Sequence, residues 1–323
     1  MGKPIVLSGM QPTGKLHLGN LEGALRNWVS LQDNYEMYLC IVDWHSLTSD
    51  FDHTQDLKER IFQMAVDYLA SGLDPNKCAI FVQSHVKEHA ELFLLLSMIV
   101  PIPWLERVPS YKEKSVELNL DSYGFLGYPL LQAADILLYK ANYVPVGKDQ
   151  LPHIELTREV ARRFNHIYGN VFPEPDVLLT KFAVVPGIDG RKMSKSYNND
   201  IAIADSPEET EKKVMKMITD PQKIYKRDKG RPEICPVYSL HQIYNSKYQE
   251  IYKGCSSGEL GCVDCKKMLA SHINSNLAPI RAKRKELEKS PDKVKQVLEN
   301  GETRARAKAQ ATMQDVRKAM KLE

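Results

Sequence analysis

The chain of 323 residues has no uninterrupted apolar run of membrane-spanning length. Its most apolar stretch, ELFLLLSMIVPIPWL at 91–105, is broken by Pro101 and Pro103. The N-terminus lacks the layout of a secretory signal, and the sequence has no internal repeat and no low-complexity linker. We therefore expect a cytoplasmic protein with no membrane partner.

Net charge is also low, at +3, but it is unevenly distributed. Residues 277–323 contain 13 Lys/Arg and 7 Asp/Glu, so the chain before them is slightly acidic. A basic tail on an acidic body favours a polyanionic partner. A solvated helix with mixed charges explains the same pattern equally well.

Short apolar segments alternate with amphipathic segments in the first half of the chain. The strand candidates are 4–8, 36–47 and 77–84, and the helix candidates are 21–32, 54–72 and 88–99. This alternation predicts an α/β fold, a Rossmann-like doubly wound parallel sheet. Ligands of such sheets bind at the carboxyl ends of the strands.

The pattern becomes helical after Tyr197. Ser206, Pro207 and Glu209 form a capping-box pattern, and Ser290 and Pro291 predict a second helix start. Gly301 is the expected end of that second helix. We therefore predict two domains, a Rossmann domain at 1–205 and a C-terminal α-helical domain at 206–323.

Two short motifs indicate chemistry. The first strand is followed by SGMQPTGKLHLGN, which places His17, Gly19 and Asn20 in the first turn of a helix. A helix N-terminus suits a phosphate, although the glycine spacing is neither that of a Walker A loop nor that of a dinucleotide fingerprint. The second motif, GRKMSKSYN at 190–198, places Lys192 and Lys195 in a loop. Taken alone, each is explained by an ordinary helix start or a solvated loop.

Together the motifs resemble the two signatures of class I aminoacyl-tRNA synthetases. In that family the two elements close on ATP from opposite sides. The resemblance implies that an amino-acid carboxylate attacks the α-phosphorus of ATP, bound with Mg²⁺, and releases pyrophosphate. Lys192 and Lys195 then stabilise the charge that develops on the phosphate oxygens.

The segment GYPLLQAADILLYKANYVPVGKDQLPHIELTREVARRF at 127–164 resembles bacterial tryptophanyl-tRNA synthetases, and the resemblance covers essentially the whole chain. It implies that the protein activates L-tryptophan and transfers it to tRNA(Trp), and that it works as a homodimer. Two alternatives remain open. One is a tyrosyl-tRNA synthetase, because that family shares the fold and both motifs. The other is a synthetase-like protein that binds nucleic acid but no longer charges tRNA.

The resemblance assigns three groups of site residues. The catalytic group is His17, Lys114, Lys192 and Lys195. The ATP-binding group is Gln11, Thr13, Gly19, Asn20, Gly147, Lys148, Asp149, Val184, Met193, Ser194 and Ser196. The tryptophan-binding group is Leu7, His45, Tyr128, Gln132, Asp135, Val144, Val146 and Gln150.

Asp135 is the residue expected to accept the indole N–H. A buried acceptor rejects ligands without the matching donor, so it would exclude phenylalanine. Its neighbours Ala133, Ala134 and Ile136 make the helix apolar nearly all round, where an unpaired carboxylate would be costly. Gln132 departs from the family pattern, because many bacterial relatives carry Met there.

Six cysteines are present. Cys40 and Cys78 lie in strand candidates and are expected to be buried apolar residues. Cys235, Cys255, Cys262 and Cys265 follow the spacing C-x19-C-x6-C-x2-C, which suggests a metal site of four thiolates. Spacing alone leaves zinc and a [4Fe–4S] cluster open. A subset of the bacterial family carries a [4Fe–4S] cluster with a similar x6, x2 ending and a somewhat longer first spacer. The resemblance favours the cluster over two alternatives, zinc and free thiols.

The resemblance implies that the helical domain at 206–323, which carries the four-cysteine site, binds the tRNA anticodon, and that the cluster has a structural role there. The C-terminal tail contains further candidate contacts to tRNA. Arg304, Arg306 and Lys308 are the basic residues expected to face it. A solvated helix face accounts for them almost as well.

Overall fold

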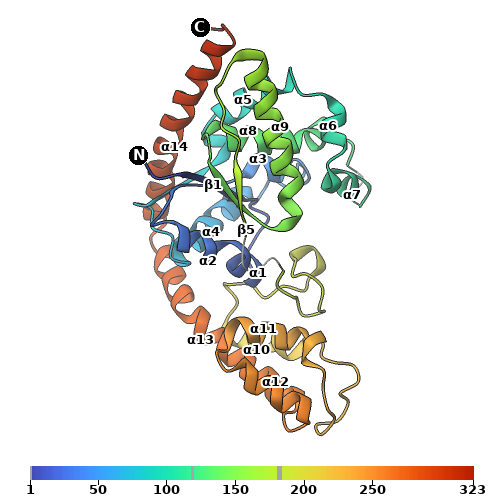
Figure 1. Ribbon diagram of the computed structural model, residues 1–323. Helices are drawn as coiled ribbons and strands as arrows, with labels where there is room; N and C mark the ends of the chain where they lie inside the picture. The colour runs from blue at the N-terminus through green and yellow to red at the C-terminus, as the bar shows by residue number, and fades with distance from the viewer. Residues whose placement is uncertain (1, 118–119, 180–183) are drawn as a thin grey trace.

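Five parallel strands form one sheet in the order β3-β2-β1-β4-β5 (Figure 1). The computed structural model describes residues 2–117, 120–179 and 184–323, without the side chains of Lys114 and Val116. The strands are β1 Ile5–Met10, β2 Glu36–Ile41, β3 Cys78–Val82, β4 Tyr143–Val146 and β5 Asp176–Leu179. The α/β prediction is confirmed.

Helices cover both faces of the sheet. Successive side chains of a strand point to opposite faces, and neighbouring residues of β2 accordingly belong to different core clusters. Leu39 packs in the cluster that contains the residues of α4, whereas Cys40 packs in the cluster that contains those of α5, α8 and α9. These helices are α4 Leu57–Ala70, α5 Glu88–Ser97, α8 Tyr123–Leu138 and α9 Leu151–Tyr168.

The other helices before the C-terminal lobe are shorter. They are α1 Leu18–Asn20, α2 Arg26–Leu31, α3 Asp43–Leu47, α6 Ile102–Glu106 and α7 Pro109–Glu117. A single π-helical turn, Leu21–Leu25, joins α1 to α2. No helix in the described ranges is both long and apolar enough to span a lipid bilayer.

The C-terminal helices form a smaller lobe below the sheet and a long connection back to it (Figure 1). The lobe contains α10 Pro207–Lys216, α11 Pro236–Tyr244 and α12 Tyr248–Ser257. The connection consists of α13 Cys262–Glu288 and α14 Pro291–Ala319. The capping box at Ser206 is confirmed, because its hydroxyl accepts from Glu209 N at 3.1 Å while Ser206 N donates to the Glu209 carboxylate at 2.8 Å.

The prediction that Gly301 ends a helix is wrong. Gly301 lies inside α14, where a Cβ atom would lie 1.9 Å from the carbonyl oxygen of Ile80. The glycine therefore allows α14 to approach the backbone of β3, the edge strand of the sheet. Ser290 precedes this helix, but its side chain does not cap it.

The C-terminal helix contributes to the core of the sheet domain. Ala305, Ala309 and Met313 belong to the same buried cluster as residues of α5 and α8. Arg304 donates to the carbonyls of Pro75 and Cys78 at 3.0 and 3.2 Å. The division at residue 205 stays a prediction, but α14 packs with the sheet rather than with the lower lobe.

Candidate active site

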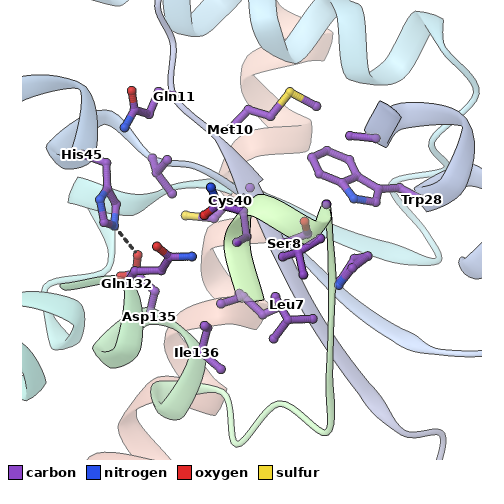
Figure 2. A pocket seen from close by; sticks show the side chains of 18 of the residues that line it. Leu7, Ser8, Met10, Gln11, Trp28, Cys40, His45, Gln132, Asp135 and Ile136 are labelled. Carbon is purple, nitrogen blue, oxygen red and sulfur yellow. Dashed lines mark hydrogen bonds and ion pairs between the residues drawn. The ribbon is translucent and has the colours of Figure 1, made fainter. Parts of the chain in front are cut away.

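A cavity of about 310 Å³ opens at the carboxyl edge of the sheet, between β1 and β4 (Figure 2). The strand order reverses at this point, which is where ligands of such sheets bind. Seven residues of the predicted tryptophan-binding group line the cavity: Leu7, His45, Gln132, Asp135, Val144, Val146 and Gln150. Gln11 and Gly147 of the predicted ATP-binding group also line it.

Asp135 lies at the floor of this cavity on α8 and is 4% exposed. His45 Nε2 lies 2.8 Å from Asp135 Oδ2, as the dashed line in Figure 2 marks. His89 Nδ1 lies 2.7 Å from Oδ1, and Gln83 Nε2 donates to both oxygens at 2.8 and 2.9 Å. Burial alone would raise the pKa of Asp135, but the charge of His89 and hydrogen bonds from His45 and His89 lower it to about 2.

Gln83 and His89 were not identified from the sequence. Both are completely buried and support Asp135 from outside the lining of the cavity. His89 in turn lies with Nε2 2.8 Å from the hydroxyl of Tyr139. Gln83 directly follows β3, and the carboxyl end of a strand is where ligand-binding residues of such sheets lie, so its position could have identified it as a site residue from the sequence. No local pattern marks His89, because only the packing of α5 against α8 brings it to Asp135.

His45 is the donor to Asp135 that lines the cavity. A carboxylate has about four lone-pair positions, and Gln83, His45 and His89 together use four contacts. A ligand donor can therefore reach Asp135 only if one of the present contacts weakens, and His45 is the one that a ligand in the cavity meets.

A second cavity of about 620 Å³ shares Met10 and Gln11 with the first. Both signature motifs contribute to its lining. Residues of the predicted catalytic and ATP-binding groups that line it are Gln11, Thr13, His17, Asn20, Ser194, Lys195 and Ser196. The structure therefore brings together segments that are about 175 residues apart in the sequence.

Lys195 reaches from the second motif to the loop of the first. Its ammonium lies 3.5 Å from the hydroxyl of Thr13. Burial, opposed by the charges of Asp200 and Asp67, lowers the pKa of Lys195 to about 8. Burial and the charge of Lys195 lower the pKa of His17 to about 4, so His17 is neutral at pH 7.

Asn199 braces the loop that carries the lysines, and sequence reasoning missed it. Its side-chain oxygen accepts from Ser194 N at 2.7 Å, and its nitrogen donates to Asp189 Oδ1 at 2.7 Å and to Lys192 O at 3.2 Å. Asn199 is 1% exposed. One buried amide therefore ties both ends of the loop together, and the hydrogen bond from Asn199 lowers the pKa of Asp189.

Among the remaining predicted residues whose side chains the structure describes, Tyr128 alone lines either cavity. Tyr128 lines the second cavity and not the first, with its hydroxyl 2.6 Å from Ser110 Oγ. Lys192 is exposed, 4.0 Å from a carboxylate oxygen of Asp149. Lys148, Asp149 and Val184 line neither cavity, and the side chain of Lys114 lies outside the described residues. Met193 is buried and lies 3.7 Å from where a Cβ of Gly19 would stand.

Residues 1–278 match the family described as tRNA synthetases class I (W and Y). The chain belongs to this family. The fold with its reversal point and the convergence of the two motifs agree with that membership.

Relatives within this class I family are similar over nearly their full lengths. A tryptophan–tRNA ligase of Thermotoga maritima is 51% identical, and one of Aquifex aeolicus is 46% identical; each match covers 98% of this chain and 99% of the relative. The crystal structure of a tryptophanyl-tRNA synthetase from Campylobacter jejuni, complexed with ADP and tryptophane, superposes with a TM-score of 0.88 at 36% identity. That match covers 98% of this chain and 99% of the Campylobacter chain.

The four clustered cysteines of this class I chain line one small cavity of about 20 Å³ in the lower lobe. Burial and the neighbouring thiols of Cys235, Cys255 and Cys262 raise the pKa of Cys265 to about 12. His241 Nε2 lies 3.5 Å from Cys265 Sγ. Among the described residues, no three of these sulfurs lie within 4.8 Å of one another. Cys40 and Cys78 are buried, as predicted.

Proposed function

We propose that this protein is a tryptophan–tRNA ligase, which converts L-tryptophan and ATP to tryptophanyl-adenylate and pyrophosphate and then transfers tryptophan to tRNA(Trp). One observation carries the proposal: a cavity with a buried, ionised Asp135 adjoins a second cavity lined by His17 and Lys195. The full-length relatives with this activity support it.

The adenylation step needs positioning and charge stabilisation. The tryptophan carboxylate attacks the α-phosphorus, and the bond to the bridging oxygen breaks to release pyrophosphate. Lys195 and Lys192 stand on the loop beside the second cavity and can meet the negative charge that develops. Neutral His17 and Asn20, at the start of α1, supply hydrogen bonds to the nucleotide, whose phosphates carry Mg²⁺.

Asp135 selects the amino acid. Its carboxylate accepts the indole N–H, and His45 yields its place on Oδ2 when the ligand enters. Gln83 and His89 keep the carboxylate oriented and ionised during this exchange. The phenylalanine side chain has no N–H donor. If it displaced His45, the Asp135 carboxylate would therefore lack the hydrogen bond that the indole N–H donates.

A tRNA and a second copy of the chain are the proposed macromolecular partners. The described surface exposes Leu94, Met98 and Ile102 within one short segment at 94–102. Large exposed apolar residues in one segment are typical of an interface, so we place the homodimer contact there. Light scattering should give a mass of twice the chain mass of 36.8 kDa. Met98→Glu should reduce the measured mass toward that of a single chain.

The four cysteines are proposed to hold a [4Fe–4S] cluster, with zinc as the alternative. Four soft thiolates suit either group, and the cluster would supply a structural cross-link between α11, α12 and α13. Four sulfurs bound to one zinc lie about 3.8 Å apart, since each zinc–sulfur bond is about 2.3 Å. Binding of either group would require the thiols around the small cavity to rearrange. Broad absorption near 400 nm with bound iron would support the cluster, and stoichiometric zinc in a colourless protein would contradict it.

Amino-acid-dependent ATP–pyrophosphate exchange tests the function. We expect exchange with tryptophan and none with phenylalanine or tyrosine at equal concentration. Exchange that depends on tyrosine, or on no amino acid, would contradict the proposal. Charging of a tRNA(Trp) transcript then tests the second step separately.

A further inference from the structure

The backbone just before α1 is held by two distant parts of the chain. Residues 16–18 of the first motif pair in antiparallel fashion with residues 201–203, through backbone hydrogen bonds of 3.0 and 2.8 Å. The N–H of Leu16 donates instead to the carboxylate of Asp67 on α4, at 3.4 Å from Oδ2. His17, which lines the second cavity, follows Leu16 directly, so the backbone that carries it depends on both contacts.

Asp67 is one member of a buried ion pair. It is 1% exposed, and its other oxygen, Oδ1, accepts from the guanidinium of Arg284, which is 5% exposed. Arg284 also donates to Gln63 and, at 2.9 Å, to the carboxylate of Glu288. Each oxygen of Asp67 therefore has its own partner: Oδ1 has Arg284, and Oδ2 has the N–H of Leu16.

Arg284 lies on α13, the helix that leaves the lower lobe and packs against α4. The rest of this contact is apolar, since Met64 of α4 and Leu277 and Leu287 of α13 belong to one buried cluster. An ion pair in such a place adds little net stability, because the cost of desolvation offsets the attraction between the charges. Packing of the two helices alone therefore does not account for a carboxylate at Asp67.

The charge of Asp67 also acts on the lysine of the second motif. Burial lowers the pKa of Lys195 most, the carboxylates of Asp200 and Asp67 oppose this effect, and Arg60 of α4 adds to it. His17 of the first motif is close to Lys195 as well, but is neutral at pH 7. Asp67 therefore favours the charged form of Lys195 from behind the first motif.

We propose that Asp67 is a positioning residue for adenylate formation. Its Oδ2 fixes the backbone of Leu16 so that His17 stands at the second cavity, and Arg284 orients the carboxylate for this hydrogen bond. Asp67 itself lines neither of the two cavities, so it acts through Leu16 and not on the substrates. The proposal rests on the proposed function, which makes adenylate formation the reaction.

The hydrogen bond is tested with an apolar pair, Asp67→Leu combined with Arg284→Met. Apolar side chains of similar volume commonly replace a buried ion pair without loss of the fold, so the variant should remain folded, as urea unfolding checks. The kcat of ATP–pyrophosphate exchange should nevertheless fall about tenfold, the effect of one lost positioning hydrogen bond, while tryptophan affinity stays unchanged. Lys283→Met, at an exposed neighbouring position of α13, is the matched control and should change neither quantity.

An amide pair, Asp67→Asn combined with Arg284→Gln, separates the hydrogen bond from the charge. It keeps an oxygen acceptor for the N–H of Leu16 and allows the two amides to bond to each other. Its kcat should therefore lie within about threefold of that of the unmodified protein. Both pairs lack the charge of Asp67, so in both the loss of activity at high pH should begin at a lower pH. A pair that only joined two helices would leave this part of the pH profile unchanged.

Hydrogen exchange of the Leu16 amide gives a readout that needs no activity. The amide should exchange faster with solvent in the apolar pair than in the unmodified protein or the amide pair. Equal protection in all three proteins would overturn the proposal.

Three kinetic results would also overturn it: a folded apolar pair with the unmodified kcat, equal losses of kcat and tryptophan affinity, or an amide pair with the unmodified pH profile. If the apolar pair does not fold, the pH profile of the amide pair decides alone. Absence of tryptophan-dependent ATP–pyrophosphate exchange in the unmodified protein would instead refute the proposed function, and would leave the hydrogen-exchange result unaffected.

Discussion

The charge of Lys195 should control the rate of adenylate formation above neutral pH. Its pKa is lowered from the ordinary lysine value of 10.5 to about 8, chiefly by burial. The charged form is therefore lost as pH rises through about 8. At pH 7 about 90% of the side chains are protonated and at pH 9 about 10%, whereas an ordinary lysine would still be about 97% charged at pH 9.

The expected effect is a fall of about tenfold in kcat/KM for ATP between pH 7 and pH 9, because this ratio follows ionisations of the free enzyme. The assay is ATP–pyrophosphate exchange at saturating tryptophan. Bound triphosphate favours the charged lysine, so kcat should decline only at higher pH.

Lys195→Arg provides the control. A guanidinium stays charged throughout this range, so the variant should lose the decline above pH 8 even if its activity is lower. Titration of ATP, Mg²⁺ or tryptophan would affect both proteins alike. A flat profile for the unmodified protein, or the same decline in Lys195→Arg, would refute the role of Lys195 and its lowered pKa.

Three substitutions test other parts of the account. Asp135→Asn should weaken tryptophan binding at least about tenfold and reduce discrimination against phenylalanine, measured by calorimetry, because an amide cannot accept from all its present donors; an unchanged dissociation constant would mean that the indole binds elsewhere. Asn199→Ala should lower the kcat of ATP–pyrophosphate exchange about tenfold with little change in tryptophan affinity, since the lysine loop loses the hydrogen bonds that hold it. Equal losses of kcat and of tryptophan affinity would indicate a general folding defect instead. Gly301→Ala should lower the free energy of unfolding, measured in urea, by about 1–3 kcal/mol, because its Cβ would overlap the Ile80 carbonyl. The control Glu299→Ala, at an exposed position of the same helix, should be nearly neutral. If Gly301→Ala were as stable as the unmodified protein, α14 could not approach β3 this closely.

Features that depend on neighbouring residues were predictable from the sequence. The strands β1, β2 and β3 each overlap a predicted strand. The prediction of a strand over 36–47 was wrong beyond Ile41, because Asp43–Leu47 form the helix α3. The Ser206 capping box was correct because its hydrogen bonds span only three residues. The burial of Asp135 was expected from its apolar neighbours, whereas its place in a substrate pocket was implied only by the family resemblance.

Features that depend on packing between distant segments were not predictable. His89 meets Asp135 only because α5 packs on α8, and Gly301 lies inside a helix only because that helix crosses β3. Glycine is unfavourable inside a helix, so Gly301 was taken for a helix end. The reason for this glycine is the close backbone of Ile80, which lies 221 residues earlier and cannot be inferred from the local sequence. Asn199 was overlooked for a similar reason, since a buried Asn and a solvated Asn look alike in a polar loop.

A crystal structure with tryptophan and a non-hydrolysable ATP analogue would show whether the two cavities hold the two substrates. We expect the indole nitrogen within hydrogen-bonding distance of Asp135, with His45 displaced from Oδ2, and the triphosphate between the first turn of α1 at His17 and the ammonium of Lys195. An indole bound away from Asp135, or a triphosphate that contacts neither His17 nor Lys195, would contradict it.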